Sequence, residues 1–455
     1  MPNYIGSEVN SGVEIKGAKA LVVGMAKSGV AAVELLRKHG AEVRATDLKP
    51  EPAALQTLAD LRVPFEPQTA DVFQRADLIV LSPGVPADLD ALEAARRRGA
   101  TVIGEVELAG YFLEGPIIGI TGSNGKTTTT ALAGHILRES GIPVQVGGNI
   151  GTPVTAMIDS SRPQQWNVLE LSSFQLETIC RFRAKISVAL NVTPDHLDRH
   201  HTFERYAAAK ARLFETQVEG DFAVLNADDP VCVRYAALTK AAPVWFSSTR
   251  AVSPGISLRN GQVWFDNGLL MPAAEIPIRG MHNVENTMAA AAACRLAGAS
   301  REQIAAAVRT FHAVEHRLEF VRNVSGVDFY NDSKATNVDA TLKALDAFDG
   351  GLWVILGGKD KDSDYTVLRQ ALAKKARAAM LIGAAAGKIR DQISGALPLM
   401  DSKTIDVAVR DAYASAKPGD TVLLAPACAS FDQFDNFEHR GRVFKSLVAQ
   451  LEPKR

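Results

Sequence analysis

The fold is decided by one stretch of sequence, Gly119-Ile120-Thr121-Gly122-Ser123-Asn124-Gly125-Lys126-Thr127-Thr128. An apolar run at 116–120 predicts a β-strand before this loop, and a helical pattern at 131–137 follows it. Such a loop cradles phosphates, because its backbone N–H groups and the helix N-terminus point at anionic oxygens. The lysine adds a positive charge, and a threonine hydroxyl can bind Mg²⁺. We therefore predict that a nucleoside triphosphate binds at Gly122, Ser123, Asn124, Gly125, Lys126, Thr127 and Thr128.

The match to the general phosphate-loop pattern is incomplete, because the pattern has a glycine where this chain has Ile120. The alternative is a glycine turn that caps a helix and leaves Lys126 in solvent. The strand before the loop and the helix after it favour phosphate binding.

The composition is that of a soluble globular protein with 455 residues, 47% of them hydrophobic, and a formal net charge of −1. This charge gives no attraction to nucleic acid or to a membrane surface, and no apolar run is long enough to span a bilayer. The four cysteines are scattered, which predicts reduced, buried thiols rather than disulfides or a zinc site. We expect a cytoplasmic monomer that binds small molecules and no nucleic acid.

The length and the alternation of elements predict an α/β protein with three domains. A polar arm at 1–15 precedes a Rossmann-like domain at 16–112, a central phosphate-loop domain at 113–313 and a second Rossmann-like domain at 314–455. An alternating stretch at 244–277 predicts a small antiparallel part in the central sheet, and helices are predicted at 285–296 and 301–311. Further strands are predicted at 19–23, 42–46, 78–81, 167–171, 186–191, 223–226, 327–331, 352–357, 379–382 and 421–424.

The first domain carries a degenerate dinucleotide fingerprint at 24–29, in which Ala26 replaces the middle glycine. Asp47 ends the second strand, where it can meet a ribose or another polar group. Ser82 begins a rigid turn at a strand's carboxyl end, where ligands of parallel sheets bind. The fingerprint favours a ligand that contains a nucleotide diphosphate, and a structural turn without a ligand is the alternative.

Polar loops also follow strands in the central domain. Glu170 ends one strand and could bind Mg²⁺ on the nucleotide, although a lone glutamate there is usually solvated. The loop 191–200 holds two aspartates and two histidines, of which we select His196 as the residue facing the nucleotide. Asn283 and Asn286 share a helix face and either cap the helix or contact the nucleotide. Composition alone places Lys210 on the surface.

Three polar loops follow strands of the last domain, at 331–337, 357–362 and 426–434. Because the carboxyl ends of parallel strands meet at one edge of a sheet, these loops can converge on one small anionic ligand.

These residues together resemble the Mur ligases, ATP-dependent enzymes that form amide bonds in peptidoglycan assembly. The resemblance is carried by the segments 121–127, 147–151, 170–175, 191–198 and 280–286 and by Arg317. The loops 331–337 and 427–434 resemble the branch of the family that adds D-glutamate to UDP-N-acetylmuramoyl-L-alanine. The resemblance to the Mur ligases covers nearly the whole chain after about residue 16.

The resemblance implies a site for each substrate and for two Mg²⁺ ions. Metal would be bound by Thr127, Glu170, His196 and a carbamylated Lys210, and Lys126 would act in catalysis with the last three. ATP would also contact Asn286, Arg317 and Asp332. The muramoyl nucleotide would contact Lys27, Ser28, Asp47, Ser82, Asn149 and Gln175. Lys334 and Thr336 would bind substrate next to the residues that contact ATP. D-Glutamate would contact Lys361, Ser430 and Phe437.

Three other functions remain open from the sequence. A folylpolyglutamate synthetase would share the phosphate loop but is not expected to carry a separate N-terminal nucleotide domain. A ligase that adds L-glutamate to the same nucleotide is a closer alternative, which a single sequence leaves open. A nucleotide-binding switch protein without catalysis would explain the phosphate loop but not the three polar loops of the last domain.

Overall fold

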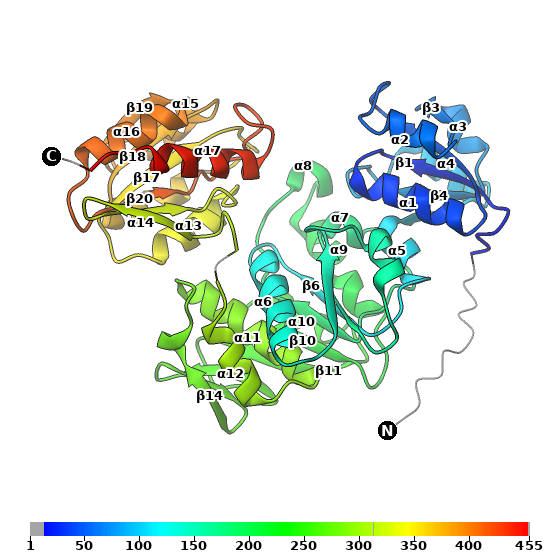
Figure 1. Cartoon of the computed structure of the whole chain (residues 1–455), viewed down its shortest axis with the longest axis horizontal. Coiled ribbons are helices and arrows are strands. Elements are labelled where there is room, and N and C mark those ends of the chain that lie inside the picture. Colours follow the sequence, from blue (N-terminus) through cyan, green and yellow to red (C-terminus); the bar gives the residue numbers. More distant parts are fainter. Residues whose placement is uncertain (1–12, 313, 454–455) are drawn as a thin grey trace.

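The computed structural model describes residues 13–312 and 314–453, which form three α/β domains, each with its own sheet. Figure 1 shows the central domain between the other two, with the N-terminal and C-terminal domains on opposite sides of it. The predicted polar arm lies outside the described residues up to residue 12. The predicted fold class is confirmed.

The N-terminal sheet is fully parallel, in the order β3-β2-β1-β4-β5. Four of the five residues of β1 are buried, which is typical of a strand covered on both faces. The 24–29 turn, Asp47 and Ser82 follow β1, β2 and β4 and lie at one edge of the sheet. The elements are β1 (Lys19–Val23), α1 (Lys27–Lys38), β2 (Glu42–Asp47), α2 (Leu55–Asp60), β3 (Phe65–Pro67), α3 (Ala70–Gln74), β4 (Leu78–Leu81), α4 (Asp90–Arg97), β5 (Thr101–Gly104) and α5 (Glu105–Gly110).

The central sheet has nine strands in the order β14-β13-β12-β11-β10-β9-β6-β8-β7. The predicted antiparallel part is confirmed for β12, β13 and β14, whereas β11 pairs in parallel with both of its neighbours. The strands are β6 (Ile117–Thr121), β7 (Val144–Gly148), β8 (Trp166–Glu170), β9 (Ile186–Ala189), β10 (Phe222–Asn226), β11 (Ala242–Ser247), β12 (Gly255–Arg259), β13 (Gln262–Phe265) and β14 (Gly268–Pro272). The α-helices are α6 (Lys126–Glu139), α7 (Ser173–Leu176), α8 (Leu197–His200), α9 (Phe203–Glu215), α10 (Pro230–Tyr235), α11 (Met281–Leu296) and α12 (Arg301–Arg309), and 3₁₀ turns lie at Val154–Ser160 and Ala273–Glu275.

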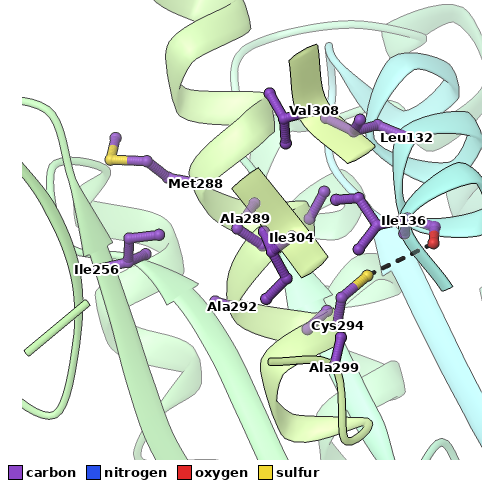
Figure 2. Close-up of a cluster of buried hydrophobic side chains, with 14 of the residues drawn as sticks. Leu132, Ile136, Ile256, Met288, Ala289, Ala292, Cys294, Ala299, Ile304 and Val308 are labelled. Carbon is purple, nitrogen blue, oxygen red and sulfur yellow. Dashed lines mark hydrogen bonds between the residues drawn. The ribbon is translucent and has the colours of Figure 1, made fainter. Parts of the chain in front are cut away.

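The core of the central domain fixes the helix that follows the phosphate loop. Figure 2 shows α6, α11 and α12 packed together, with Leu132 and Ile136 of α6 facing Ile304 and Val308 of α12. The alanines at 289–293 of α11 are fully buried, and their small side chains allow close packing of α11 on α6. This packing holds the N-terminus of α6, where the phosphate loop ends.

The C-terminal sheet runs in the order β15-β16-β20-β17-β18-β19 and is parallel except for the pair β15–β16. Because β16, β20 and β17 are parallel neighbours, the loops at 331–337, 426–434 and 357–362 begin at the same end of the sheet, and their convergence on one ligand stays a prediction. The elements are β15 (Glu319–Val324), β16 (Val327–Asn331), α13 (Val338–Asp346), β17 (Leu352–Gly357), a 3₁₀ turn (Thr366–Leu368), α14 (Arg369–Lys375), β18 (Ala376–Ile382), α15 (Ala386–Ile393), β19 (Leu399–Lys403), α16 (Ile405–Ser415), β20 (Thr421–Leu424) and α17 (Phe437–Ala449).

Two predictions from composition can be compared with the described residues. Within 13–312 and 314–453, no helix has both the length and the apolar character that crossing a membrane requires. All four cysteines are free, and Cys232, Cys294 and Cys428 are buried, but Cys180 is exposed. The prediction of a buried thiol is wrong for Cys180, whose backbone N–H binds Glu107 in a loop while its side chain faces outward.

Candidate active site

The phosphate loop lies directly against α11. Gly125 has φ +87°, and a Cβ atom at this position would lie 2.1 Å from Oδ1 of Asn286. Only glycine fits, because a side chain would strain the backbone and collide with Asn286. Asn286 donates from Nδ2 to Oδ1 of Asn283 at 3.0 Å, so the predicted asparagine pair lies beside the loop.

Lys126 folds back over the phosphate loop. Its Nζ donates to the carbonyl oxygens of Gly122 at 2.8 Å and Ser123 at 3.0 Å. Burial lowers the pKa of Lys126, while the negative charges of Glu170 and Asp195 oppose this shift. The positive charge of the Lys126 ammonium group is therefore stabilised by two carbonyl oxygens of the loop and by the nearby carboxylates of Glu170 and Asp195.

Lys210 is not on the surface, where composition would place it. Its side chain comes from α9, is 1% exposed, and donates from Nζ to the carbonyl oxygen of Gly122 at 2.8 Å. The Nζ atom also lies 4.5 Å from the centre of the Tyr206 ring. Burial lowers the pKa of Lys210 well below its ordinary value, and the charge of Lys126 adds to the shift. The structure thus favours a neutral amine beside the phosphate loop.

Glu170 carries an unsatisfied oxygen next to these lysines. The residue is 1% exposed, and its Oε1 accepts a hydrogen bond from Nδ2 of Asn149 at 2.8 Å. Its Oε2 is buried without a hydrogen-bond partner. A buried carboxylate oxygen without a partner is strongly unfavourable unless a cation meets it. This atom fits a metal ion, since hard divalent cations prefer carboxylate oxygens.

His196 lies in the left-handed region at φ +54°, just before α8. Its Nε2 lies 3.7 Å from Oδ2 of Asp195. Burial lowers the pKa of His196 despite the opposing charge of Asp195, so the imidazole is neutral near pH 7. A neutral imidazole has a free nitrogen lone pair and can bind a metal.

The C-terminal domain contacts the phosphate loop. Arg317 donates from Nη2 to Oγ1 of Thr127 at 3.1 Å, and Asn337 donates to Oδ2 of Asp195 at 3.1 Å. Asn124 donates to the carboxylate of Asp339. A cavity of about 40 Å³ remains between the domains, and the predicted ATP-contacting residues that line it are Asn124, Gly125, Thr128, Asn286, Arg317 and Asp332. Burial raises the pKa of Asp332 to about 7, with Arg317 opposing the shift.

A larger cavity, of about 540 Å³, lies between the N-terminal and central domains. Asp47 accepts hydrogen bonds from the backbone N–H groups of Met25 at 2.6 Å and Lys49 at 2.9 Å, so it shapes the wall. Asn149 lines the same cavity and binds Glu170, which joins this cavity to the phosphate loop. The residues predicted to contact the muramoyl nucleotide all line this cavity, namely Lys27, Ser28, Asp47, Ser82, Asn149 and Gln175.

The substrate-binding residues predicted in the C-terminal domain form two groups, one around Lys334 and one around Ser430. Lys334 places its Nζ 3.8 Å from the centre of the Phe437 ring, and burial lowers its pKa to about 8. Thr336 is half-buried and donates its backbone N–H to the carbonyl oxygen of Lys334 at 2.8 Å. Ser430 is 2% exposed and lies on a loop paired with the loop of Lys361, because Lys359 and Ala429 exchange backbone hydrogen bonds.

Lys361 is exposed, and its charge reaches Asp195 in the loop 191–200. Burial would raise the pKa of Asp195, but the positive charges of Lys361 and Lys126 and the hydrogen bond from Asn337 help to keep it low. Lys361 is flanked by Asp360 and Asp362, and Lys388 forms ion pairs with both, at 2.7 Å and 3.4 Å. The flanking carboxylates are therefore neutralised by Lys388 rather than by Lys361.

Several residues at the site were not selected from the sequence. Tyr206 shares a hydrogen bond of 2.9 Å with Oγ of Ser123. Arg440 is fully buried and donates to the carbonyl oxygens of Ser333 at 2.9 Å and Cys428 at 3.1 Å, which joins two of the three C-terminal loops. Asp195 lies within a recognised motif and could have been selected by its position, whereas no local signal marks Arg440.

Family comparisons agree with this arrangement. The Mur ligase MurD-like N-terminal domain matches residues 18–104, the Mur ligase middle domain matches 120–294, and the Mur ligase glutamate ligase domain matches 316–428. Two solved structures share the fold at low sequence identity. A pseudomurein peptide ligase type C from Methanothermus fervidus has a TM-score of 0.60 at 18% identity, over 95% of this chain and 100% of that one. A UDP-N-acetylmuramate-alanine ligase from Thermotoga maritima has a TM-score of 0.60 at 19% identity, over 95% and 99%.

Two curated relatives are far more similar in sequence. A UDP-N-acetylmuramoylalanine–D-glutamate ligase of Solibacter usitatus is 67% identical, over 97% of this chain and 100% of the relative. A protein of the same name from Acidobacterium capsulatum is 52% identical, over 96% and 97%. With all three domains matched and identity this high along the chain, the protein belongs to the Mur ligase family.

Proposed function

We propose that this protein is an ATP-dependent ligase that joins D-glutamate to UDP-N-acetylmuramoyl-L-alanine during synthesis of peptidoglycan precursors. The observation that carries the proposal is the position of Asn149, which lines the 540 Å³ cavity and binds Glu170 at 2.8 Å beside the phosphate loop. A nucleotide-linked substrate in this cavity would end where a γ-phosphate would lie. The names of the 67% and 52% identical relatives supply the identity of the two acids.

The reaction proceeds in two displacements. A carboxylate oxygen of the nucleotide-linked alanine attacks the γ-phosphorus of ATP, and the bond to ADP breaks to give an acyl phosphate. The amine of D-glutamate then attacks the acyl carbon, loses a proton, and phosphate leaves with the oxygen that had attacked. Phosphoryl transfer requires mainly positioning and neutralisation of charge. Lys126 and Arg317 are the cations on this chain that would face the transferred phosphoryl group.

Magnesium fits the residues around the phosphate loop. Glu170 offers a buried, unpartnered oxygen, His196 a neutral imidazole and Thr127 a hydroxyl. We infer that two Mg²⁺ ions are held here, where they would neutralise phosphate charge. Lys210 completes the set as a carbamate, formed when its neutral amine adds CO₂ and releases a proton. The strongly lowered pKa of Lys210 supports this, because only the neutral amine reacts.

Each substrate would use a different domain. The domain at 16–112 would bind the uridine diphosphate, the domain at 113–313 would bind ATP, and the domain at 314–455 would bind D-glutamate. The cavity at the ATP residues is about 40 Å³, far smaller than a nucleotide-sized site of at least about 300 Å³. We infer that the C-terminal domain moves away from the phosphate loop when ATP enters. The 3.1 Å contact from Arg317 to Thr127 and the contact from Asn124 to Asp339 would then open.

The D-glutamate site would lie on the C-terminal loops. Lys361 and Ser430 would meet the side-chain carboxylate of D-glutamate, and the Phe437 ring, which contacts Lys334, would form a wall of the site. Lys334 and Thr336 would lie toward the reacting carboxylate and phosphate. One chain supplies residues for all three substrates, which supports a monomeric enzyme, and its use of ATP supports a cytoplasmic location.

Replacing Lys388 with methionine should raise the KM for D-glutamate about fivefold, with kcat little changed. Without Lys388, the carboxylates of Asp360 and Asp362 would compete with the substrate for Lys361. An interaction between partly exposed charges is worth about 1 kcal/mol, which corresponds to a change in KM of this size. The change should become smaller at high salt, because salt screens the charges. Steady-state kinetics at two ionic strengths measures both effects. Lys374→Met on exposed α14 is the matched control and should leave KM unchanged. An unaltered KM in Lys388→Met would contradict the role of Lys388.

Phosphate release from purified protein tests the function itself. The reaction contains ATP, Mg²⁺, UDP-N-acetylmuramoyl-L-alanine and either D- or L-glutamate. We expect release that depends on D-glutamate and forms one amide per phosphate. Faster release with L-glutamate would change the assigned enantiomer. Absence of amino-acid-dependent release with both would reject the ligase proposal and favour a nucleotide-binding switch.

A further inference from the structure

We propose that Arg199 is a positioning residue that couples binding of the muramoyl nucleotide to the geometry of the loop 191–200, which carries the proposed metal ligand His196. This inference rests on the proposed function. Arg199 is part of α8, three residues after His196, and its side chain is 15% exposed. No role follows from the motif that contains it. Its contacts connect the α7 segment, which follows Glu170, to the turn after β4 in the N-terminal domain.

The first contact crosses from the central domain to the N-terminal domain. Nη2 of Arg199 donates to the carbonyl oxygen of Val85 at 2.8 Å, and Nη1 lies 3.5 Å from the carbonyl oxygen of Gly84. Gly84 and Val85 belong to the turn after β4 and line the 540 Å³ cavity. A ligand that orders this turn therefore also fixes the carbonyl groups that Arg199 binds.

The second contact is an ion pair within the central domain. Nη2 of Arg199 also donates to Oε2 of Glu177 at 2.8 Å, and Oε1 of Glu177 lies 3.2 Å from Nδ1 of His200. Glu177 directly follows α7, in the segment that begins with Glu170 and includes Gln175 of the cavity. The guanidinium group thus connects the turn after β4, called the substrate turn below, to the segment that supplies Glu170, one of the proposed metal ligands.

The third contact leads to His196, a second proposed metal ligand. The guanidinium carbon of Arg199 lies 5.1 Å from the centre of the Phe174 ring. The Phe174 ring in turn meets the His196 ring edge-on, with the centroids 4.9 Å apart. His196 is in the left-handed region at φ +54°, so its ring depends on surrounding contacts for its orientation. Arg199 and Phe174 provide two consecutive contacts between the substrate turn and this ring.

Arginine is suited to this position by its shape. Its planar group offers five N–H donors in a fixed arrangement and a flat face for an aromatic ring, so it can bind a carbonyl, a carboxylate and a ring together. A lysine ammonium keeps the charge but not the flat face or the fork. Binding energy gained at the uridine diphosphate, far from the reacting atoms, can then improve alignment where the phosphoryl group moves.

The expected behaviour is reciprocal coupling between two ligands. The muramoyl nucleotide should tighten binding of Mg²⁺ with a non-hydrolysable ATP analogue, and the analogue should tighten nucleotide binding by the same factor. Such factors are typically about 5- to 150-fold. In Arg199→Met we expect the factor to fall to about one, while the affinity for the nucleotide alone changes less than about threefold. Arg199→Lys should behave like Arg199→Met.

Isothermal titration calorimetry on the full chain measures the four dissociation constants of this cycle. Arg205→Met, at an exposed arginine on α9, is the control and should keep the wild-type coupling. Phe174→Leu leaves the ion pair intact but removes the ring, and it should also abolish coupling. Wild-type coupling that survives in Arg199→Met or Phe174→Leu would overturn this inference alone. A wild-type protein that binds no muramoyl nucleotide would overturn the proposed function together with it.

Discussion

Replacing Lys210 with alanine should lower kcat on the order of 10³-fold, and short carboxylates such as acetate should restore part of the activity. A loss of kcat of this size is typical when one preorganised group that stabilises charge in the transition state is removed. The side chain is 1% exposed and reaches the carbonyl oxygen of Gly122, so its removal leaves a gap beside the phosphate loop. A small carboxylate can enter this gap and supply the anionic oxygens that we assign to the carbamate.

The measurement is the initial rate of Lys210→Ala against acetate concentration, with chloride as the salt control. Lys210→Arg is the matched variant, because it keeps a long side chain that ends in nitrogen but cannot form a carbamate, and it should be as impaired as the alanine variant. Lys240→Ala, at an exposed lysine, should be fully active. Wild-type activity of Lys210→Ala without added carboxylate would remove the carbamate from the mechanism.

Replacing Glu170 with glutamine should lower kcat about 10²- to 10³-fold and raise the Mg²⁺ concentration needed for half-maximal rate. Oε2 of Glu170 is buried without a partner, so its negative charge is held for a cation. Glutamine preserves the shape but removes the charge. Chelation by EDTA should stop the wild-type reaction, and added Mg²⁺ should restore it.

An Mg²⁺ titration of the initial rate separates this role from a loss of folding. Glu139→Gln, at an exposed glutamate in the last turn of α6, is the control and should keep the wild-type Mg²⁺ dependence. Thermal unfolding of the apo protein should show Glu170→Gln to unfold cooperatively like the wild type, because glutamine keeps the shape of the buried side chain. A Glu170→Gln variant with unchanged Mg²⁺ dependence would exclude Glu170 as a metal ligand.

Strand prediction from the sequence succeeded inside the sheets and failed at their edges. The strands predicted at 78–81, 327–331, 352–357 and 421–424 have the observed bounds of β4, β16, β17 and β20. The strands that were not predicted are β3, β5, β7, β15 and β19, and each lies at the edge of its sheet. An inner parallel strand is covered on both faces and reads as a continuous apolar run. An edge strand such as β15 is largely exposed, so this signal is lost.

The candidate site was predictable where one motif carries both the fold and the chemistry. Gly125, Lys126 and Asn286 lie together as the sequence indicated, because short segments fix their local geometry. The roles assigned to them remain proposals. Arg440 and Arg199 were not selected, since both donate to backbone carbonyls of distant segments, in addition to their side-chain contacts. A carbonyl partner leaves no trace in the residue types, so such contacts become visible only in the folded chain.

The most direct test of the mechanism follows one oxygen atom. UDP-N-acetylmuramoyl-L-alanine labelled with ¹⁸O in its alanine carboxylate is converted with ATP and D-glutamate, and the released phosphate is analysed by mass spectrometry. If the carboxylate attacks the γ-phosphorus and the amine then displaces phosphate, each released phosphate carries one ¹⁸O atom from the substrate. Release of unlabelled phosphate alongside amide formation would contradict the acyl phosphate, and with it the role assigned to the phosphate loop.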